Sequence, residues 1–208
     1  MPLPNILADF RNAIALHKGF IARGHALDAN GAPLADQSER EFVVESAFLR
    51  MFVAWESFLE HSLVAYLLGE SSMSGRAPAR FVTPQSAAHC AAILIGTQKY
   101  VDWANPEIVR KLTRLYLDQG EPLAPVIASI QTDLFDLKTV RNAAAHLAGT
   151  TVQALDALAS RKLSKQCTGT RVTTLLLALD RSSTQPATLL DYYLNLLDIA
   201  ADQIVTWR

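Results

Sequence analysis

Apolar residues recur every three or four positions along most of this chain, a period typical of amphipathic α-helices. We therefore predict an all-α fold, a helical bundle with one long early helix and extra short helices. The predicted helices cover about 5–23, 38–68, 84–96, 105–120, 127–146, 151–165 and 187–207. Segment 171–179 fits a buried strand or an apolar helix, and its β-branched start favours an extended conformation. A loop is expected from Ser182 to Pro186.

The longest predicted helix runs from Ser38 to Leu68. Ser38 and Glu41 have the spacing of a capping box, in which each side chain satisfies a backbone N–H of the other residue. The main apolar stripe of this helix consists of Phe48, Phe52, Trp55, Leu59, Leu63 and Tyr66. Further large apolar residues lie on its other faces, namely Met51, Phe58 and Leu67. Such a helix is expected to be buried centrally or at a subunit interface.

Cap residues predict where three other helices begin. Asn5 is a candidate N-cap for the first helix. Thr83-Pro84 and Asn105-Pro106 each pair a capping side chain with a proline in the first helical position. For the helix that follows Asn105, the expected inward residues are Ile108, Leu112 and Leu115.

Length and composition limit the class of protein. A chain of 208 residues is long enough for one well-packed domain, here expected to span 1–208. Only 19% of the residues are charged, below the usual quarter or so, which suggests that another subunit covers part of the surface. No leader sequence and no apolar run of about 18 residues are visible, so we expect a cytoplasmic protein without membrane contact.

Several residues with reactive side chains fit ordinary structural roles. His17 lies on the apolar face of the first helix, which indicates a packed core histidine. His89 and Cys90 are adjacent and would point about 100° apart on a helix, which makes a poor catalytic pair. Cys90 and Cys167 match no metal or disulfide spacing, and we expect both to be reduced and buried.

The most distinctive stretch is Arg141 to His146, at the end of a predicted helix. Arg141 continues the apolar stripe of that helix, so its permanent charge needs a partner carboxylate or a bound anion. Glu56, in the aromatic segment of the long helix, is the first candidate partner, and a glutamate that faces solvent fits the pattern equally well. Gly149 is a good residue for the position just after a helix, which places His146 in the last turn.

This stretch and segment Phe48 to Glu60 of the long helix together resemble the HEPN superfamily. That superfamily consists of small all-helical domains, many of them metal-independent ribonucleases. Val140 to Leu147 is close to the family motif, in which four residues separate an arginine from a histidine. Phe48 to Glu60 resembles the long early helix of the RiboL-PSP-HEPN branch. The resemblance implies an up-and-down bundle and an endoribonuclease of a defence, toxin–antitoxin or RNA-processing system. It also implies products with 2′,3′-cyclic phosphate and 5′-hydroxyl ends.

The motif residues suit RNA cleavage without a cofactor or metal ion. His146 can act as base or acid, Arg141 can hold phosphate oxygens, and Asn142 can orient either one. Five positions along a helix differ by about 140° in direction and about 7.5 Å along the axis, so one chain does not direct both side chains at one point. We therefore expect a homodimer whose site uses both copies. Ala148 replaces the tyrosine of HEPN toxins silenced by nucleotidyltransferase antitoxins, which argues against a partner of that kind.

Basic residues follow the motif. Between Leu137 and Leu179 the only acid is Asp156. The candidate RNA-binding residues in this window are Lys138, Arg161, Lys162 and Lys165. Because the net charge is −1, any attraction to RNA must be local.

Two alternatives to the ribonuclease remain open from the sequence. One is a catalytically silent HEPN domain that mediates dimerisation or binds a nucleotide or a partner protein, such as an antitoxin or defence-system component. The other is a helical domain in which Arg141 only pairs with a buried acid.

Overall fold

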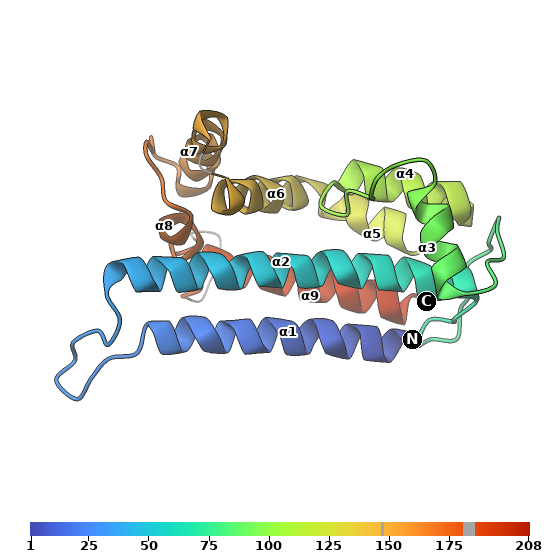
Figure 1. Ribbon diagram of the computed structural model, residues 1–208, viewed down its shortest axis with the longest axis horizontal. Helices are drawn as coiled ribbons and strands as arrows, with labels where there is room; N and C mark the ends of the chain where they lie inside the picture. The colour runs from blue at the N-terminus through green and yellow to red at the C-terminus, as the bar shows by residue number, and fades with distance from the viewer. Residues whose placement is uncertain (147, 181–185) are drawn as a thin grey trace. The chain divides into compact units, whose positions relative to one another are not determined.

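The computed structural model describes residues 1–146, 148–180 and 186–208 (Figure 1). These residues form an all-α structure that fits a helical bundle, as the apolar periodicity predicts. The only β-structure among them consists of isolated bridges. The helices are α1 Leu3–Gly24, α2 Gln37–Leu68, α3 Ala87–Ile95, α4 Pro106–Tyr116, the 3-10 turn η1 Asp118–Gly120, α5 Leu123–Ser129, α6 Gln131–Ala145, α7 Gly149–Leu163, α8 Val172–Leu176 and α9 Leu189–Thr206.

The chain forms two compact units, and each is built from separate segments. Unit 1 comprises Met1–Arg11, Trp55–Phe135 and Leu196–Arg208. Unit 2 comprises Asn12–Ala54 and Asp136–Asn195. That 1–208 is a single HEPN-like domain stays a prediction. In the part of the chain that the structure describes, no helix has the length and apolar character needed to span a bilayer.

Helix α2 has 32 residues, and its predicted extent is confirmed within a residue. All six residues of the predicted stripe are buried, and so are Met51, Phe58 and Leu67. The predicted capping box is wrong by two positions. The backbone N–H of Glu39 donates to Asp36 Oδ1 at 2.9 Å, and that of Asp36 donates to Glu39 Oε2 at 2.8 Å. Asp36 therefore caps α2, because an aspartate serves this role as well as Ser38 would.

Aromatic packing on α2 forms the centre of unit 1. The ring of Phe10 lies 5.9 Å from that of Trp55 and 5.4 Å from that of Phe58, and the Trp55 and Phe58 rings stack at 5.6 Å. The Tyr66 hydroxyl donates to the Ile204 carbonyl at 2.6 Å, which links α2 to α9. Burial of these aromatic groups supplies much of the stabilisation of unit 1.

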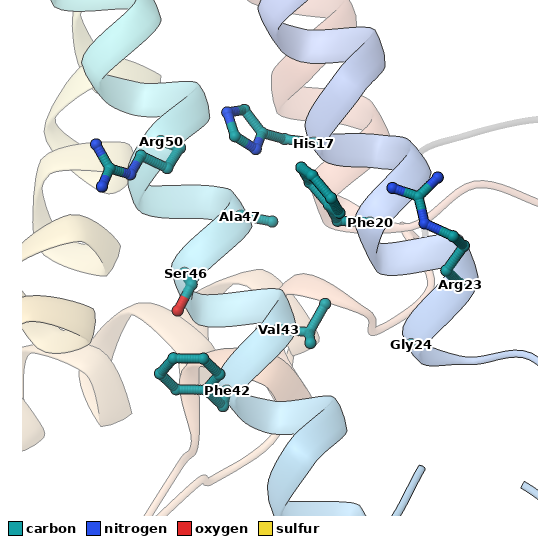
Figure 2. A pocket seen from close by; sticks show the side chains of 9 residues that line it. All are labelled: His17, Phe20, Arg23, Gly24, Phe42, Val43, Ser46, Ala47 and Arg50. Atoms are coloured by element: carbon teal, nitrogen blue, oxygen red, sulfur yellow. The ribbon is translucent and has the colours of Figure 1, made fainter. Parts of the chain in front are cut away.

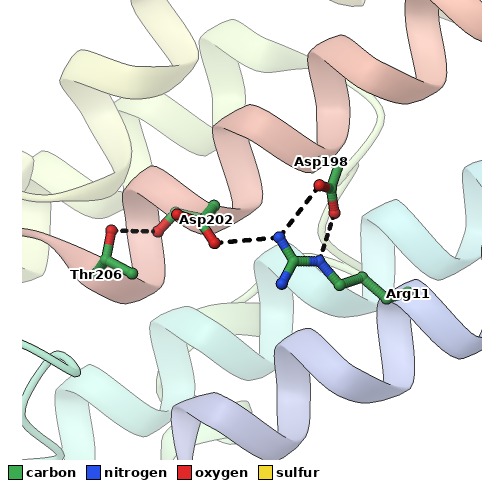
Figure 3. A network of polar contacts seen from close by, with 4 residues as sticks. All are labelled: Arg11, Asp198, Asp202 and Thr206. Atoms are coloured by element: carbon green, nitrogen blue, oxygen red, sulfur yellow. Dashed lines mark hydrogen bonds and ion pairs between the residues drawn. The ribbon is translucent and has the colours of Figure 1, made fainter.

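Charged contacts link α1 to α9 in both units. In unit 1, Arg11 donates to Asp198 and Asp202, and the Thr206 hydroxyl donates to the Asp202 carbonyl (Figure 3). In unit 2, Lys18 Nζ lies 2.7 Å from Asp191 Oδ1. These pairs are nearly half exposed, so they contribute specificity of pairing more than free energy.

Three predicted helix starts meet different outcomes. The Asn105 cap is confirmed: its Oδ1 accepts from the Glu107 N–H at 3.0 Å. The Asn5 cap is wrong, because α1 begins at Leu3. The Thr83 cap is wrong as well, because Ser86 is the N-cap of α3. The Ser86 Oγ accepts from the His89 N–H at 3.1 Å.

The predicted inner face of α4 is wrong by one position. Val109 and Thr113 are fully buried, while Leu115 is 61% exposed. The Thr113 hydroxyl donates to the Arg110 carbonyl at 3.0 Å, so a polar residue can occupy the buried face.

The predicted motif helix consists of two helices. Ile130, with φ −114° and ψ 17°, separates α5 from α6. The predicted apolar stripe is nonetheless buried, namely Ile127, Ile130, Leu134 and Leu137. Helix α6 ends at Ala145, and Gly149 is the first residue of α7 rather than the end of the motif helix.

The described part of the chain after α6 contains three helices, α7, α8 and α9. Helices α7 and α9 lie where predicted, and the five predicted inward residues of α9 are buried, namely Leu190, Tyr193, Leu197, Ala200 and Ile204. The extended segment predicted at 171–179 is wrong, because 172–176 form the short helix α8. Val172, Leu175 and Leu176 are buried there at helical spacing. Most of the loop expected from Ser182 to Pro186 lies outside the described residues.

Two phenylalanines of α2 provide a test of this packing. We expect Phe58→Ala to lower the free energy of unfolding by about 3–5 kcal/mol, because Phe58 is 1% exposed within the aromatic cluster. Phe42→Ala is the matched control on the same helix, and at 71% exposure it should change the value by less than about 0.5 kcal/mol. Urea denaturation followed by circular dichroism measures both. Equal effects of the two substitutions would contradict this placement of α2.

Candidate functional site

A cavity in unit 2 contains the motif arginine. It has a volume of about 560 Å³, and we call it the α2–α6 cavity. Its lining comes from α2 and α6, namely Phe42, Ser46, Leu49, Arg50, Val53, Arg141 and Ala145. Apart from the adjacent pair Leu49 and Arg50, the α2 residues follow one another three or four positions apart, so one stripe of α2 forms a wall. Arg141 and Ala145 are one turn apart on α6 and form the other.

Arg141 is partly buried in this wall. Its Nη1 donates to Asn142 Oδ1 at 3.3 Å. Among the described residues of unit 2, no carboxylate forms an ion pair with Arg141 or with Arg50, which lines the same cavity. Two guanidinium groups on one cavity repel each other, and an anion bound between them would relieve that repulsion. A bound anion would therefore suit this cavity.

The placement of His146 differs from the prediction. Helix α6 ends one residue earlier, although the His146 N–H still donates to the Asn142 carbonyl at 2.9 Å. The His146 carbonyl accepts from Thr151 Oγ1 at 2.7 Å, which ties it to α7. The residue is exposed and is not among those that line the α2–α6 cavity. One chain thus presents Arg141 in the cavity and His146 beyond it.

Arg50 is the residue that the sequence reasoning missed. Arg50 lies in segment Phe48 to Glu60, where the resemblance to the HEPN superfamily assigns it no role. The available signal was the polar pair Ser46 and Arg50, one turn apart in the otherwise apolar segment 46–55. That pattern shows that α2 has two polar residues on one face, but it does not show which helix packs beside them. The packing of α6 is what places Arg50 and Arg141 in the lining of one cavity.

A second cavity adjoins the other side of this part of α2 (Figure 2). We call it the α1–α2 cavity, and its volume is about 490 Å³. It is lined by nine residues, namely His17, Phe20, Arg23, Gly24, Phe42, Val43, Ser46, Ala47 and Arg50. Phe42, Ser46 and Arg50 line both cavities.

His17 is not the packed core histidine that its apolar helix face predicts. It is partly exposed and lines the α1–α2 cavity. Burial lowers the pKa of His17, and the positive charge of Arg50 lowers it further. Both causes favour the neutral imidazole. The prediction failed because periodicity shows only which face of α1 carries His17. Whether His17 is buried depends on a neighbouring element that fills the space beside it, and here that space is a cavity.

Two of the predicted RNA-binding residues pair with a buried acid. Asp136 is 4% exposed, and its carboxylate lies 2.5 Å from Arg161 Nη2 and 3.1 Å from Lys162 Nζ. The ammonium group of Lys162 also lies 5.1 Å from the ring centroid of Tyr193. The window from Leu137 to Leu179, in which Asp156 is the only acid, begins one residue after this aspartate. One of the positive charges counted there is therefore neutralised by Asp136 within unit 2.

The other residues named from the sequence lie apart from one another. Lys138 is a partly exposed residue of α6. Lys165 is exposed and lines a different cavity of about 510 Å³ beside the 166–171 loop. Glu56 belongs to unit 1, and its predicted pairing with Arg141 stays a prediction. Roles of these residues in RNA binding or support of the site likewise stay predictions.

The acids near the basic segment have structural roles. Asp156 accepts from the N–H groups of Gly169 and Thr170 at 2.9 and 2.7 Å, and hydrogen bonding from Thr170 lowers the pKa of this carboxyl. Glu41 pairs with Arg171, and hydrogen bonds from Gln37 and Arg171 lower its pKa. Asp156 holds the 168–170 loop to α7, and Glu41 joins the start of α2 to the segment before α8.

The remaining candidates for chemistry offer no second site. Cys90 is buried, and burial raises the pKa of its thiol to about 11, while the neighbouring His89 is exposed. Cys167 is partly exposed rather than buried as expected. Over 1–146, 148–180 and 186–208, no three His, Cys, Asp or Glu side chains are grouped as a metal would require.

The Arg50 charge can be tested at His17. We expect Arg50→Gln to raise the pKa of His17, because it removes the neighbouring positive charge. The value should stay below the ordinary one because burial persists. Arg40→Gln removes a charge from the same helix outside both cavities and should leave the pKa of His17 unchanged. An NMR titration of the ring protons measures both, and identical curves for wild type and Arg50→Gln would contradict this geometry.

Comparisons with protein families, with curated proteins and with solved structures find no match to this chain.

Proposed function

We propose that this protein is a metal-independent endoribonuclease of the HEPN type, with Arg141, Asn142 and His146 as its catalytic residues. The observation that carries the proposal is the placement of Arg141 beside Arg50 in an open cavity whose lining contains no acid. Two such guanidinium groups favour binding of a phosphodiester, which carries one negative charge. A guanidinium group can donate two parallel hydrogen bonds to the phosphate oxygens. The resemblance of both motif segments to HEPN ribonucleases supplies the reaction.

In the proposed reaction, His146 of one subunit takes the proton of a ribose 2′-hydroxyl. The 2′-oxygen forms a bond to phosphorus, and the bond from phosphorus to the 5′-oxygen breaks. Arg141 and Arg50 stabilise the charge that builds up on the phosphorane oxygens. The same His146, now protonated, delivers a proton to the leaving 5′-oxygen. The products are a 2′,3′-cyclic phosphate and a 5′-hydroxyl.

The second alternative from the sequence is an arginine that only neutralises a buried acid, and it has little support in unit 2. Arg141 has an amide partner there and no carboxylate partner among the described residues of that unit. The silent binding module keeps one specific observation in its favour: His146 does not line the cavity that holds Arg141. Such a module would use the two arginines to bind a nucleotide or an anionic partner and would leave RNA intact.

Cleavage of RNA in EDTA decides between the enzyme and the module. We expect purified protein to cut single-stranded RNA, and His146→Ala and Arg141→Ala each to lower the rate by about a hundredfold or more. His61→Ala is the control for loss of a histidine, because His61 is exposed on α2 in unit 1. Product ends are identified by their resistance to a phosphatase that removes only 3′-monophosphates. Intact RNA with the wild-type protein, or cleavage unaffected by His146→Ala, argues for the module.

Mixing the two inactive variants tests the shared site. If each site takes Arg141 from one subunit and His146 from its partner, a mixed dimer of the variants contains one intact site. Random exchange then restores about a quarter of the wild-type rate, since half of the dimers are mixed and each has one of two sites. Sedimentation of the same mixture establishes that dimers form. No recovery in an exchanged dimer would show that each site is built within one chain.

A further inference from the structure

The α1–α2 cavity has the size and walls of a small-molecule site. Its volume of about 490 Å³ lies within the usual range of about 300–1,000 Å³ for ligand pockets. Val43 and Ala47 point from α2 toward α1, and Phe20 extends from α1 into the space between the helices (Figure 2). Gly24 allows this end of α1 to approach α2 closely, since an added Cβ would lie 3.2 Å from Val43 Cγ1.

The charges around this cavity have one sign. Arg23, Arg50 and His17 are among the nine lining residues, and none of the nine is acidic. The Arg23 guanidinium lies 4.7 Å from the Phe20 ring centroid, and the His17 ring lies 5.7 Å from the same ring. Figure 2 shows the Arg50 headgroup directed away from α1. Arg23 and His17 are therefore the groups that a ligand here would meet, and Arg50 contributes its charge from the far side of α2.

Few polar atoms are available to recognise a ligand by hydrogen bonding. Apart from the three basic side chains, Ser46 supplies the only polar side chain of the lining. A nucleobase or a sugar would leave several of its donors and acceptors unpaired in such a site, at a cost in affinity. A flat apolar body with a single anionic group leaves none unpaired, since aromatic walls contact the body and the cations contact the anion.

We propose that the α1–α2 cavity binds a small amphipathic organic anion, with an aromatic body and one carboxylate or sulfonate group. The body lies against Phe20, Val43 and Ala47, and the anionic group lies near Arg23 and His17. This site is separate from the ribonuclease reaction, and its test does not depend on RNA cleavage. It shares α2 with the α2–α6 cavity through Phe42, Ser46 and Arg50.

The test uses two fluorescent probes that differ only in charge. 1-Anilinonaphthalene-8-sulfonate carries the sulfonate, and N-phenyl-1-naphthylamine has the same rings without it. We expect saturable binding of one sulfonate probe per chain, and binding of the neutral probe that is weaker by about tenfold or more. Arg23→Gln should weaken binding of the sulfonate probe by about fivefold, and Arg23→Lys, which keeps the charge, should weaken it less. Arg40→Gln is the matched control on α2 and should have no effect.

Two further measurements locate the probe. The ring-proton resonances of His17 should shift on addition of the sulfonate probe, because it is the one histidine of the five in the chain, all of them described, that lines this cavity. Ala47→Met should abolish binding by filling the cavity, and a wild-type circular dichroism spectrum verifies its fold. Displacement of the probe by 1-naphthoate but not by a nucleoside monophosphate supports the proposed ligand class.

The opposite results would overturn the proposal. Equal affinity for both probes, or no change in Arg23→Gln, would mean that the probe adsorbs to exposed apolar side chains such as Phe42. Displacement by a nucleoside monophosphate alone would mean that the site recognises nucleotides. Unshifted His17 resonances at saturation would place the probe elsewhere on the chain.

Discussion

Helix α2 must bury large apolar side chains on more than one face, and both compact units depend on that burial. Phe48 and Phe52 lie in the part of α2 that belongs to unit 2, while Trp55 and Phe58 lie in the part that belongs to unit 1. No single neighbouring helix can cover such a surface, so other helices must pack around α2. The unusual length of α2 lets one element supply buried aromatic groups to both units.

Near its start, the same helix carries residues that the packing leaves partly open. Phe42, Ser46 and Arg50 lie between two cavities, and α6 supplies Arg141 to one of them. A guanidinium cannot lose its charge in a protein, so a partly buried arginine needs an anion from the protein or from solution. In unit 2, Asp136 pairs with Arg161 and Lys162, Glu41 pairs with Arg171, and no described carboxylate lines the α2–α6 cavity. This distribution of acids is what makes the α2–α6 cavity suited to a bound anion.

The same argument changes the meaning of the basic segment after the motif. Counting charges along the sequence suggests a surface for a polyanion, but a buried aspartate one residue outside the counted window holds two of those charges. A positive charge that compensates a buried acid contributes little to attraction at a distance. Local attraction of RNA would then depend more on Arg50 and Arg141 than on the charges of α7.

The sequence by itself determined the all-α class, the extent of α2, the buried stripes of α2 and α9, and the Asn105 cap, because periodicity and capping act over a few neighbouring residues. It also marked Arg141 as an arginine on an apolar stripe. It did not locate the end of α6, the partly exposed place of His17, the role of Asp136 or the neighbourhood of Arg50. Those depend on residues far apart in sequence, such as Arg50 and Arg141, which come to line one cavity only once α2 and α6 pack together. Whether a charged side chain is compensated or open to a ligand is a property of that packing.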